Sequence, residues 1–258
     1  MLYRDYFSVD AGAYASFRPR YPPALFDFLA SCAPARDVAW DCATGNGQAA
    51  IGLALHFARV IATDASESQI SRAIPHRCVE YRTALAERSG LEGAAVDLVT
   101  VAQALHWLNR EAFYDEAKRV LVSRGVLAVW CYGLLDVTPE IDSHVRSFYF
   151  DTLGPFWPPG RELVDTGYST IDFPFEEISA PPISIEKELT LEELAGYLRT
   201  WSATRRFIES RGHDPVGEVI RVVKEHWGEP GTRRIARWPL HVRVGRVSHH
   251  DSGAVGRP

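Results

Sequence analysis

The sequence predicts an α/β fold in which helices cover a mostly parallel sheet. The first observation is the segment Val38 to Gln48, VAWDCATGNGQ, where a short apolar run ends in an acid and leads through a glycine turn into a helical stretch. The second is another apolar run, which ends in Asp64. The third is Asp97 to Gln103, DLVTVAQ, whose continuous apolar character is typical of a strand buried on both faces. Strands that alternate with helices are typical of a parallel sheet.

The glycine turn predicts a binding site for a nucleoside. A strand that passes through a turn into a helix directs backbone N–H groups and the positive end of the helix dipole towards a ligand. Gly45 and Gly47 lack a Cβ atom, so a ligand can lie directly on the backbone. Asp64 ends the second strand, where it can accept hydrogen bonds from both ribose hydroxyls. Together these features predict a nucleoside-binding βαβ unit.

Asp41 distinguishes between the nucleosides that such a unit binds. Residues 45–50, GNGQAA, also satisfy the relaxed dinucleotide pattern G-x-G-x-x-G/A, so an NAD-dependent oxidoreductase is one alternative. A carboxylate directly ahead of the turn would face the pyrophosphate of a dinucleotide, and like charges repel. The same carboxylate suits S-adenosylmethionine, which carries an ammonium and a sulfonium but no phosphate. A non-catalytic protein that binds this cofactor is a further alternative.

Asp41, Gly45 and Gly47 resemble the first motif of the class I S-adenosylmethionine-dependent methyltransferases, acid-x-Gly-x-Gly-x-Gly. Ala43 stands at the first glycine of that motif, and alanine disfavours the left-handed backbone that a glycine adopts there. The resemblance implies S-adenosylmethionine as cofactor and S-adenosylhomocysteine as product. It also implies a cofactor site made of Asp41, Ala43, Thr44, Gly45, Asn46, Gly47, Asp64, Ala65, Gln69, Ala86, Glu87 and Gln103.

The resemblance covers roughly the first 135 residues and implies a Rossmann-like class I methyltransferase fold. That fold has a mostly parallel seven-stranded sheet with an antiparallel last strand, here with a helical or irregular cap inserted after the fifth strand. Cys78 to Thr83 is expected as the third strand and Gly125 to Tyr132 as the fifth. Asn109 to Val122 is expected as a helix with Asn109 as its N-cap. His241 to Val247, HVRVGRV, alternates and is expected as the last strand.

Changes in composition divide the chain into four parts. Residues 1–35 are expected to form an N-terminal arm with a first helix, and residues 36–135 an S-adenosylmethionine-binding core. Residues 136–230 are expected to form a substrate-binding cap, and residues 231–258 a final strand with a frayed tail. The aromatic and arginine-rich start of the arm, residues 1–21, is expected to close over the cofactor as a lid.

The cap begins with a segment rich in aromatic residues and proline, residues 136–182, which we expect to be irregular. Ile183 to Leu189 is expected as a strand. Helices are expected to begin at the capping box Thr190-Leu191-Glu192-Glu193 and at Asp214-Pro215.

His106 is the candidate catalytic residue, because it follows the fourth strand at the switch point where open α/β sheets bind ligands. It could act as a base for a phenol or amine, as a hydrogen-bond donor to a carboxylate, or as a purely structural loop residue. The candidate substrate contacts are mostly aromatic and come from the arm, the fourth strand's loop and the cap: Tyr14, Arg18, Tyr21, Trp107, Tyr197, Trp201 and His213.

Two segments, YASFRPRYPPALFDFLA and QALHW, resemble the small-molecule branch of the family that includes trans-aconitate methyltransferase. The branch esterifies carboxylates, which implies cationic clamps rather than a base. The possible clamps are Arg18, Arg199, Arg205 and Arg206. A phenol or amine acceptor with His106 as base is the alternative.

Charge and composition exclude several other classes of function. The net charge of −5 and the pI near 6.0 disfavour a nucleic-acid partner. No apolar run reaches the ~20 residues that cross a bilayer, and the chain does not start with a signal-peptide pattern. The four cysteines form no C-x-x-C pair, which disfavours a metal site and indicates reduced thiols. We therefore expect a cytoplasmic monomer or homodimer that acts on a small molecule.

Overall fold

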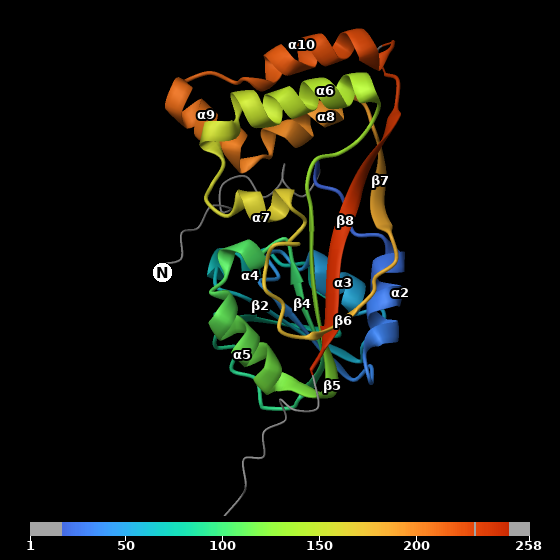
Figure 1. Ribbon diagram of the computed structural model, residues 1–258, viewed down its shortest axis with the longest axis vertical. Helices are drawn as coiled ribbons and strands as arrows, with labels where there is room; N and C mark the ends of the chain where they lie inside the picture. Colours follow the sequence, from blue (N-terminus) through green and yellow to red (C-terminus); the bar gives the residue numbers. More distant parts are fainter. Residues whose placement is uncertain (1–16, 230, 248–258) are drawn as a thin grey trace, which may run out of the picture.

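The computed structural model describes residues 17–229 and 231–247. These residues form an α/β body with a layer of helices above one end of its sheet (Figure 1). In the described ranges, no helix combines the length and apolar character needed to cross a membrane.

A mixed sheet of eight strands forms the centre of the body, in the order β3-β2-β1-β4-β5-β8-β6, with β7 also paired to β8. Strands β1 to β5 are parallel, and β8 is antiparallel to β5, β6 and β7. The bounds are β1 Val38–Cys42, β2 Arg59–Asp64, β3 Val79–Thr83, β4 Val96–Ala102, β5 Leu121–Tyr132, β6 Glu176–Ile178, β7 Ile183–Leu189 and β8 Arg234–Arg246. The Rossmann-like fold with an antiparallel last strand is confirmed, but the expected count of seven strands is wrong.

The extra strand is β6, which pairs with the end of β8 from Glu176 opposite Arg246 to Ile178 opposite Val244. β8 itself begins seven residues before the expected strand at His241. The second half of β8 pairs with β5, from Tyr132 opposite Leu240 to Val126 opposite Arg246. Its first half continues beyond the body and pairs with β7, from Leu189 opposite Arg234 to Ile183 opposite Leu240. β8 thus joins the body to the helical layer in one continuous strand (Figure 1).

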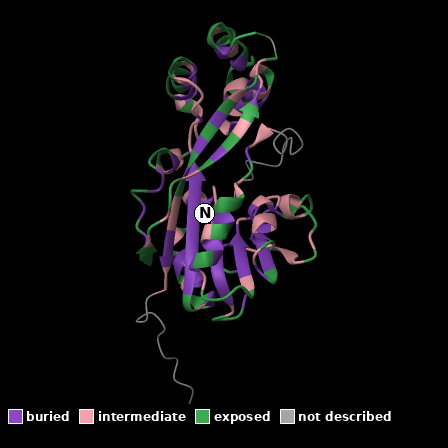
Figure 2. Cartoon of the chain, turned by 90° about the vertical axis from the view of Figure 1, so that its right-hand side faces the viewer, coloured by how far each residue is buried: buried purple, intermediate pink, exposed green. Residues whose placement is uncertain are grey.

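Alternate residues of the central strands pack on opposite faces of the sheet, as the two-residue period of a strand requires. Ala39 lies in the cluster that contains Leu29 of the first described long helix, whereas Trp40 lies in the cluster that contains Phe113. All four side chains are fully buried, and burial of a large apolar side chain contributes roughly 1.5–3 kcal/mol. Figure 2 shows the strands of the body as its most buried part. The helices that supply these faces are α2 Pro23–Cys32, α3 Gln48–Leu53 and α5 Arg110–Val120, whereas α4 Glu67–Ile70, after β2, has no buried residue.

The cap contains more regular structure than its sequence indicates. Helix α6, Pro139–Ser147, continues into a π-helical turn over Phe148–Thr152, and β6 also falls within the segment expected to be irregular. The reason is a buried face at helical spacing, formed by Ile141, Val145, Phe148 and Tyr149. The remaining helices of the cap are α7 Arg161–Asp165, α8 Leu191–Arg199, α9 Ser202–Arg211 and α10 Val216–Trp227.

Both expected helix starts in the cap are confirmed. The side chain of Thr190 accepts a hydrogen bond from the backbone N–H of Glu193 at 3.2 Å. Glu193 Oε2 accepts one from the backbone N–H of Thr190 at 2.7 Å, which completes the capping box. Asp214 Oδ1 accepts a hydrogen bond from the backbone N–H of Val216 at 2.9 Å at the start of α10.

Candidate active site

The turn after β1 is built from three residues in the left-handed region. Ala43, Gly45 and Gly47 have φ angles of 54°, 57° and 87°. Ala43 therefore adopts the backbone that alanine disfavours, at a cost of about 1–2 kcal/mol. Hydrogen bonds over the turn, such as that from Thr44 N to Thr63 O at 2.9 Å, hold this conformation.

The two glycines of the turn are needed for different reasons. A Cβ atom on Gly45 would meet only Gln69 Oε1, at 4.0 Å, so this glycine borders open space. A Cβ atom on Gly47 would overlap the hydroxyl group and ring of Tyr81. The backbone at Gly45 is therefore open to its surroundings, whereas Gly47 makes room for a side chain of the protein itself.

Asp41 lies fully buried beneath the turn. Its Oδ2 accepts a hydrogen bond from Thr44 Oγ1 at 2.5 Å and its Oδ1 accepts one from Thr100 Oγ1 at 2.7 Å. Burial raises the pKa of Asp41 to about 6, although both hydroxyl donors act to lower it. Asp41 thus ties the turn to β4 and places a carboxylate directly under it.

Asp64 holds the turn from the tip of β2. Its Oδ2 accepts a hydrogen bond from the backbone N–H of Gly45 at 2.8 Å, and its Oδ1 accepts one from Ser66 N at 2.8 Å. The carboxylate is therefore next to the open space at Gly45, where the sequence places the ribose. This arrangement requires only the ends of β1 and β2 and the turn that follows β1.

The remaining expected cofactor residues surround the same edge of the sheet. Asn46 O accepts a hydrogen bond from Ile74 N at 3.1 Å, and Glu87 Oε1 accepts one from Asn109 N at 3.1 Å. Gln103, with φ 56°, donates from Nε2 to Tyr132 O at 3.1 Å. Ala65 and Gln69 are half-buried after β2, and Ala86 is buried after β3.

A second hollow lies where the carboxyl ends of β4 and β5 meet the cap. The hollow is partly open to solvent. Its walls combine two arginines with many aromatic side chains: Arg18, Gln103, His106, Trp107, Tyr132, Gly133, Trp157, Pro158, Arg161, Tyr197, Thr200, Trp201 and Ser202. We call this hollow the junction pocket.

The junction pocket brings together most of the expected substrate residues. Its walls include Arg18, His106, Trp107, Tyr197 and Trp201. Tyr21 packs edge-on against Trp130 and Tyr132, with ring centroids 5.4 and 6.5 Å apart. His213 is exposed on the cap, and it is not among the residues of this pocket. Tyr14 and residues 1–16 of the expected lid lie outside the described residues.

His106 is fixed in the pocket wall by Tyr168. The Nδ1 atom of His106 lies 2.9 Å from the hydroxyl oxygen of Tyr168. Hydrogen bonds from the backbone of Leu105 and His106 lower the pKa of that hydroxyl, so they are donated to its oxygen. Burial still raises the pKa of Tyr168 well above its usual value, so the phenol keeps its proton. With this phenol as the donor to Nδ1, a neutral His106 carries its own proton on Nε2.

His106 stays neutral at physiological pH. Burial, assisted by the positive charge of Arg161, lowers the pKa of His106 to about 3. A neutral imidazole whose proton is on Nε2 is a hydrogen-bond donor at that atom and does not accept a proton there. The geometry favours the donor role over the role of base.

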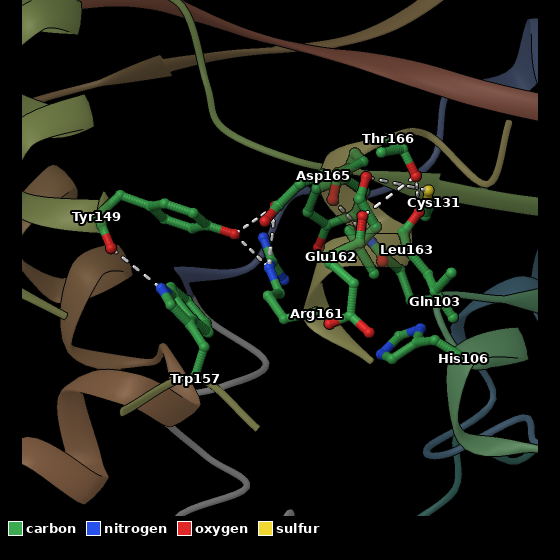
Figure 3. A network of polar contacts seen from close by, with 12 residues as sticks. Gln103, His106, Cys131, Tyr149, Trp157, Arg161, Glu162, Leu163, Asp165 and Thr166 are labelled. Carbon is green, nitrogen blue, oxygen red and sulfur yellow. Dashed lines mark hydrogen bonds and ion pairs between the residues drawn. The ribbon is translucent and has the colours of Figure 1, made fainter. Parts of the chain in front are cut away.

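Arg161 and Trp157 are pocket residues that the sequence did not indicate. Both lie in the segment expected to be irregular, where a glycine at 160 precedes the first residue of α7. Figure 3 shows the guanidinium of Arg161 beside the rings of Tyr149 and Trp157, whose centroids are 4.5 Å apart. The only sequence signal was the proline–proline–glycine run before an arginine, which is typical of a helix start. Of the arginines proposed as clamps, only Arg18 reaches the pocket walls.

The other three proposed clamps lie elsewhere. Arg199 is exposed and its Nε is 2.7 Å from Asp214 Oδ2, in an ion pair on the surface of the cap. Arg205 and Arg206 lie on α9 and are not among the residues of the junction pocket. Across the described ranges, no cluster of histidine, cysteine and acidic side chains has the arrangement of a metal site.

Residues 40–129 match the family described as the methyltransferase domain. A protein of Dictyostelium discoideum assigned as a methyltransferase is 37% identical over 219 residues, which cover 83% of this chain and 83% of that protein. A Saccharomyces cerevisiae protein assigned as an S-adenosylmethionine-dependent methyltransferase is 27% identical over 132 residues, or 48% of this chain and 45% of that protein. A solved structure from Anaeromyxobacter dehalogenans, described as a type II methyltransferase, is 44% identical with a TM-score of 0.85 and covers 89% of this chain and 97% of that chain.

Proposed function

The chain belongs to the class I S-adenosylmethionine-dependent methyltransferases, and we propose that it methylates the carboxylate of a small-molecule acid in the junction pocket. The observation that carries this proposal is the combination of two arginines, Arg18 and Arg161, with a neutral His106 in the walls of one pocket. Arginine binds carboxylates through a planar fork of N–H donors. A pocket with cationic donors and a histidine that does not take up a proton suits an acceptor that is already an anion.

The turn after β1 fits the cofactor that the family uses. The open space at Gly45 accommodates a ligand against the backbone, and Asp64 lies beside it to accept hydrogen bonds from a ribose. Asp41 adds a buried negative charge beneath the turn, which favours a cationic ligand over a pyrophosphate. When bound, S-adenosylmethionine supplies a methyl group activated by its sulfonium charge.

Esterification of a carboxylate requires no general base. The acceptor oxygen forms the new O–CH3 bond as the S–CH3 bond breaks, and the electron pair of the broken bond stays on sulfur. The negative charge of the acceptor and the positive charge of the donor disappear together, so no proton moves. The task of the protein is to hold the carboxylate in line and to exclude water, for which well-oriented groups reach effective molarities on the order of 10^5 to 10^8 M.

A panel of small acids tests this proposal. Acetate, succinate, benzoate, phenylacetate and cinnamate, each beside its primary amide, are incubated with the enzyme and S-adenosylmethionine, and release of S-adenosylhomocysteine is measured. We expect turnover of at least one acid and of none of the amides. Turnover of the amides alone, or of no acid by a protein that binds S-adenosylmethionine, would overturn the proposal.

Asp64→Ala is the matched control for the cofactor side. Because hydrogen bonds to a charged group contribute roughly 1.5–3 kcal/mol, we expect its affinity for S-adenosylmethionine to fall about 10- to 100-fold, measured by calorimetric titration. The KM for the acid should change little. Unchanged cofactor affinity in a folded Asp64→Ala protein would remove Asp64 from the cofactor site.

A further inference from the structure

Helix α7 begins directly against the backbone of His106. Gly160, with φ 87°, precedes the helix, and a Cβ atom on it would lie 3.1 Å from the carbonyl oxygen of His106. A glycine at this position therefore allows both the left-handed backbone and the close approach. The next residue, Arg161, projects from the first turn of α7 into the junction pocket.

Three side chains of the cap fix the guanidinium of Arg161 (Figure 3). The Cζ atom of Arg161 lies 4.5 Å from the centre of the Trp157 ring and 5.2 Å from the centre of the Tyr149 ring. Its Nε donates a hydrogen bond to the hydroxyl of Tyr149 and lies 3.4 Å from Asp165 Oδ1. The Tyr149 hydroxyl in turn donates to Asp165 Oδ1 at 2.5 Å. Burial raises the pKa of Tyr149, which keeps the phenol protonated for this role.

All of these contacts use the flat face or the Nε edge of the guanidinium. Among the described residues, neither Nη1 nor Nη2 of Arg161 donates a hydrogen bond, whereas Nε does. Arg18 differs, because its Nη2 donates to the backbone carbonyl of Thr200 at 3.4 Å. The terminal edge of Arg161 thus presents parallel N–H donors on a side chain that has already lost most of its freedom. Such prior ordering reduces the entropy lost on binding.

We propose that Arg161 is the residue that recognises the acceptor carboxylate, through Nη1 and Nη2, and that Tyr149, Asp165 and Trp157 are positioning residues for it. This inference rests on the proposed function. A carboxylate offers about four lone-pair positions on its two oxygens. A fork that occupies two of them leaves lone pairs free on each oxygen, and one of these can attack the methyl group.

The charge balance of the reaction predicts which kinetic constant depends on Arg161. The carboxylate loses its negative charge as the ester forms, so a cation beside it binds the substrate at least as well as the transition state. An interaction of this kind lowers KM and does not raise kcat. A general base would show the opposite pattern, because its loss lowers kcat.

The test uses the acid with the highest turnover in the panel above and measures kcat and KM for substituted enzymes. For Arg161→Met, we expect KM to rise roughly 10- to 100-fold with kcat little changed, as for the loss of hydrogen bonds to a charged group. Arg161→Lys keeps the charge without the fork, so it should fall between wild type and Arg161→Met. Tyr149→Phe should raise KM by a smaller factor, about 3- to 10-fold, because it removes only the hydroxyl that orients Nε.

Arg237→Met is the matched control, because Arg237 is an exposed arginine of β8 whose Nε lies 2.8 Å from Glu186 Oε1. Its KM should stay within about 2-fold of wild type, as is usual for a surface ion pair. Affinity for S-adenosylmethionine, measured by calorimetry, verifies that each protein is folded. An Arg161→Met enzyme with a wild-type KM for the acid, or with a loss confined to kcat, would overturn the role of Arg161 and leave the proposed function intact. A wild-type enzyme that turns over none of the acids would overturn the proposed function instead.

Discussion

On the cofactor side of the site, Asp41, Thr44 and Gly45 are close neighbours in the chain, and buried hydrogen bonds hold them in place. On the proposed acceptor side, Arg18 comes from the N-terminal arm, His106 follows β4 and Arg161 begins α7. The cofactor side offers mainly backbone and small side chains. The acceptor side offers long and aromatic side chains that different elements bring together.

This contrast indicates how each side responds to substitution. A turn with left-handed residues and a buried acid has few alternative packings, so a change there acts on the stability of the fold as well as on binding. A pocket wall made of side chains from separate elements tolerates a change in one of them. We therefore expect effects on folding to dominate at the turn and effects on kinetics to dominate at the junction pocket.

The largest effect is expected for Gly47→Ala. The new Cβ atom would overlap Tyr81, and the residue would keep a φ of 87°, so the free energy of unfolding should fall by about 2–5 kcal/mol. Gly45→Ala has the same kind of backbone penalty but open space at Cβ, so it should lose only about 1–2 kcal/mol. For each kcal/mol of stability lost, Gly45→Ala should lose more affinity for S-adenosylmethionine than Gly47→Ala does. Urea unfolding and calorimetric titration of both proteins measure the difference.

The double variant Gly47→Ala with Tyr81→Leu separates the two causes. Gly47→Ala should lose less stability in the Tyr81→Leu background than in wild type, and the loss that it still causes there, relative to Tyr81→Leu alone, is the backbone penalty. Equal stability of Gly47→Ala and Gly45→Ala would show that Tyr81 does not restrict Gly47.

The same contrast explains what the sequence could predict. The turn, both acids and the parallel strands depend on local pattern, in which apolar runs, glycines and acids follow one another at short spacing. The helix capped by Asn109 and the capping box at Thr190 are local in the same way, and both are confirmed. The conformation of Ala43 was not predicted, because the surrounding hydrogen bonds override its intrinsic preference.

The acceptor side depends on contacts between distant segments, which local pattern does not reveal. Arg161 reaches the pocket because Gly160 packs against His106 and because Tyr149 and Trp157 hold the guanidinium. Tyr149 and Trp157 lie in different parts of the cap, and His106 lies after β4. The many aromatic residues of segment 136–182 were interpreted as a sign of irregular structure. The periodic signal in that segment was the spacing of Ile141 and Val145, which are buried on successive turns of α6.

An intermediate effect is expected for the buried acid of the turn, and it depends on pH. Asp41 has an unfolded-state pKa of 3.8 and a folded-state pKa of about 6, so the folded protein favours the protonated form. Stability from this group is present below pH 4 and is lost as pH rises from about 4 to about 6, by an amount on the order of 3 kcal/mol. Asp41→Asn cannot ionise, so it should lack this part of the pH dependence and be more stable than wild type at pH 7.

Urea unfolding of wild type and Asp41→Asn between pH 4 and pH 7 measures this difference. Affinity for S-adenosylmethionine should fall in the variant, because the buried negative charge beneath the turn is lost. Parallel stability curves for the two proteins would show that Asp41 does not titrate in this range. A variant that is more stable but binds the cofactor less tightly would place Asp41 among the residues that serve binding at the expense of stability.

The smallest effect is expected for His106→Gln, on the acceptor side. Because the pKa of His106 is lowered to about 3, the imidazole is neutral from pH 5 to pH 9, and the pH–rate profile should have no limb near pH 6.5. Glutamine keeps an N–H donor but takes up no proton, so kcat with the acid should stay within about 3-fold of wild type. A base at this position would instead make the substitution lower kcat by roughly 10^2 to 10^4. Nitrogen NMR of labelled histidine distinguishes the tautomers directly, since Tyr168 should hold Nδ1 unprotonated and leave the proton on Nε2. A proton on Nδ1 together with a large loss of kcat in His106→Gln would make Nε2 an acceptor, and a phenol or amine would then replace the carboxylate as the acceptor.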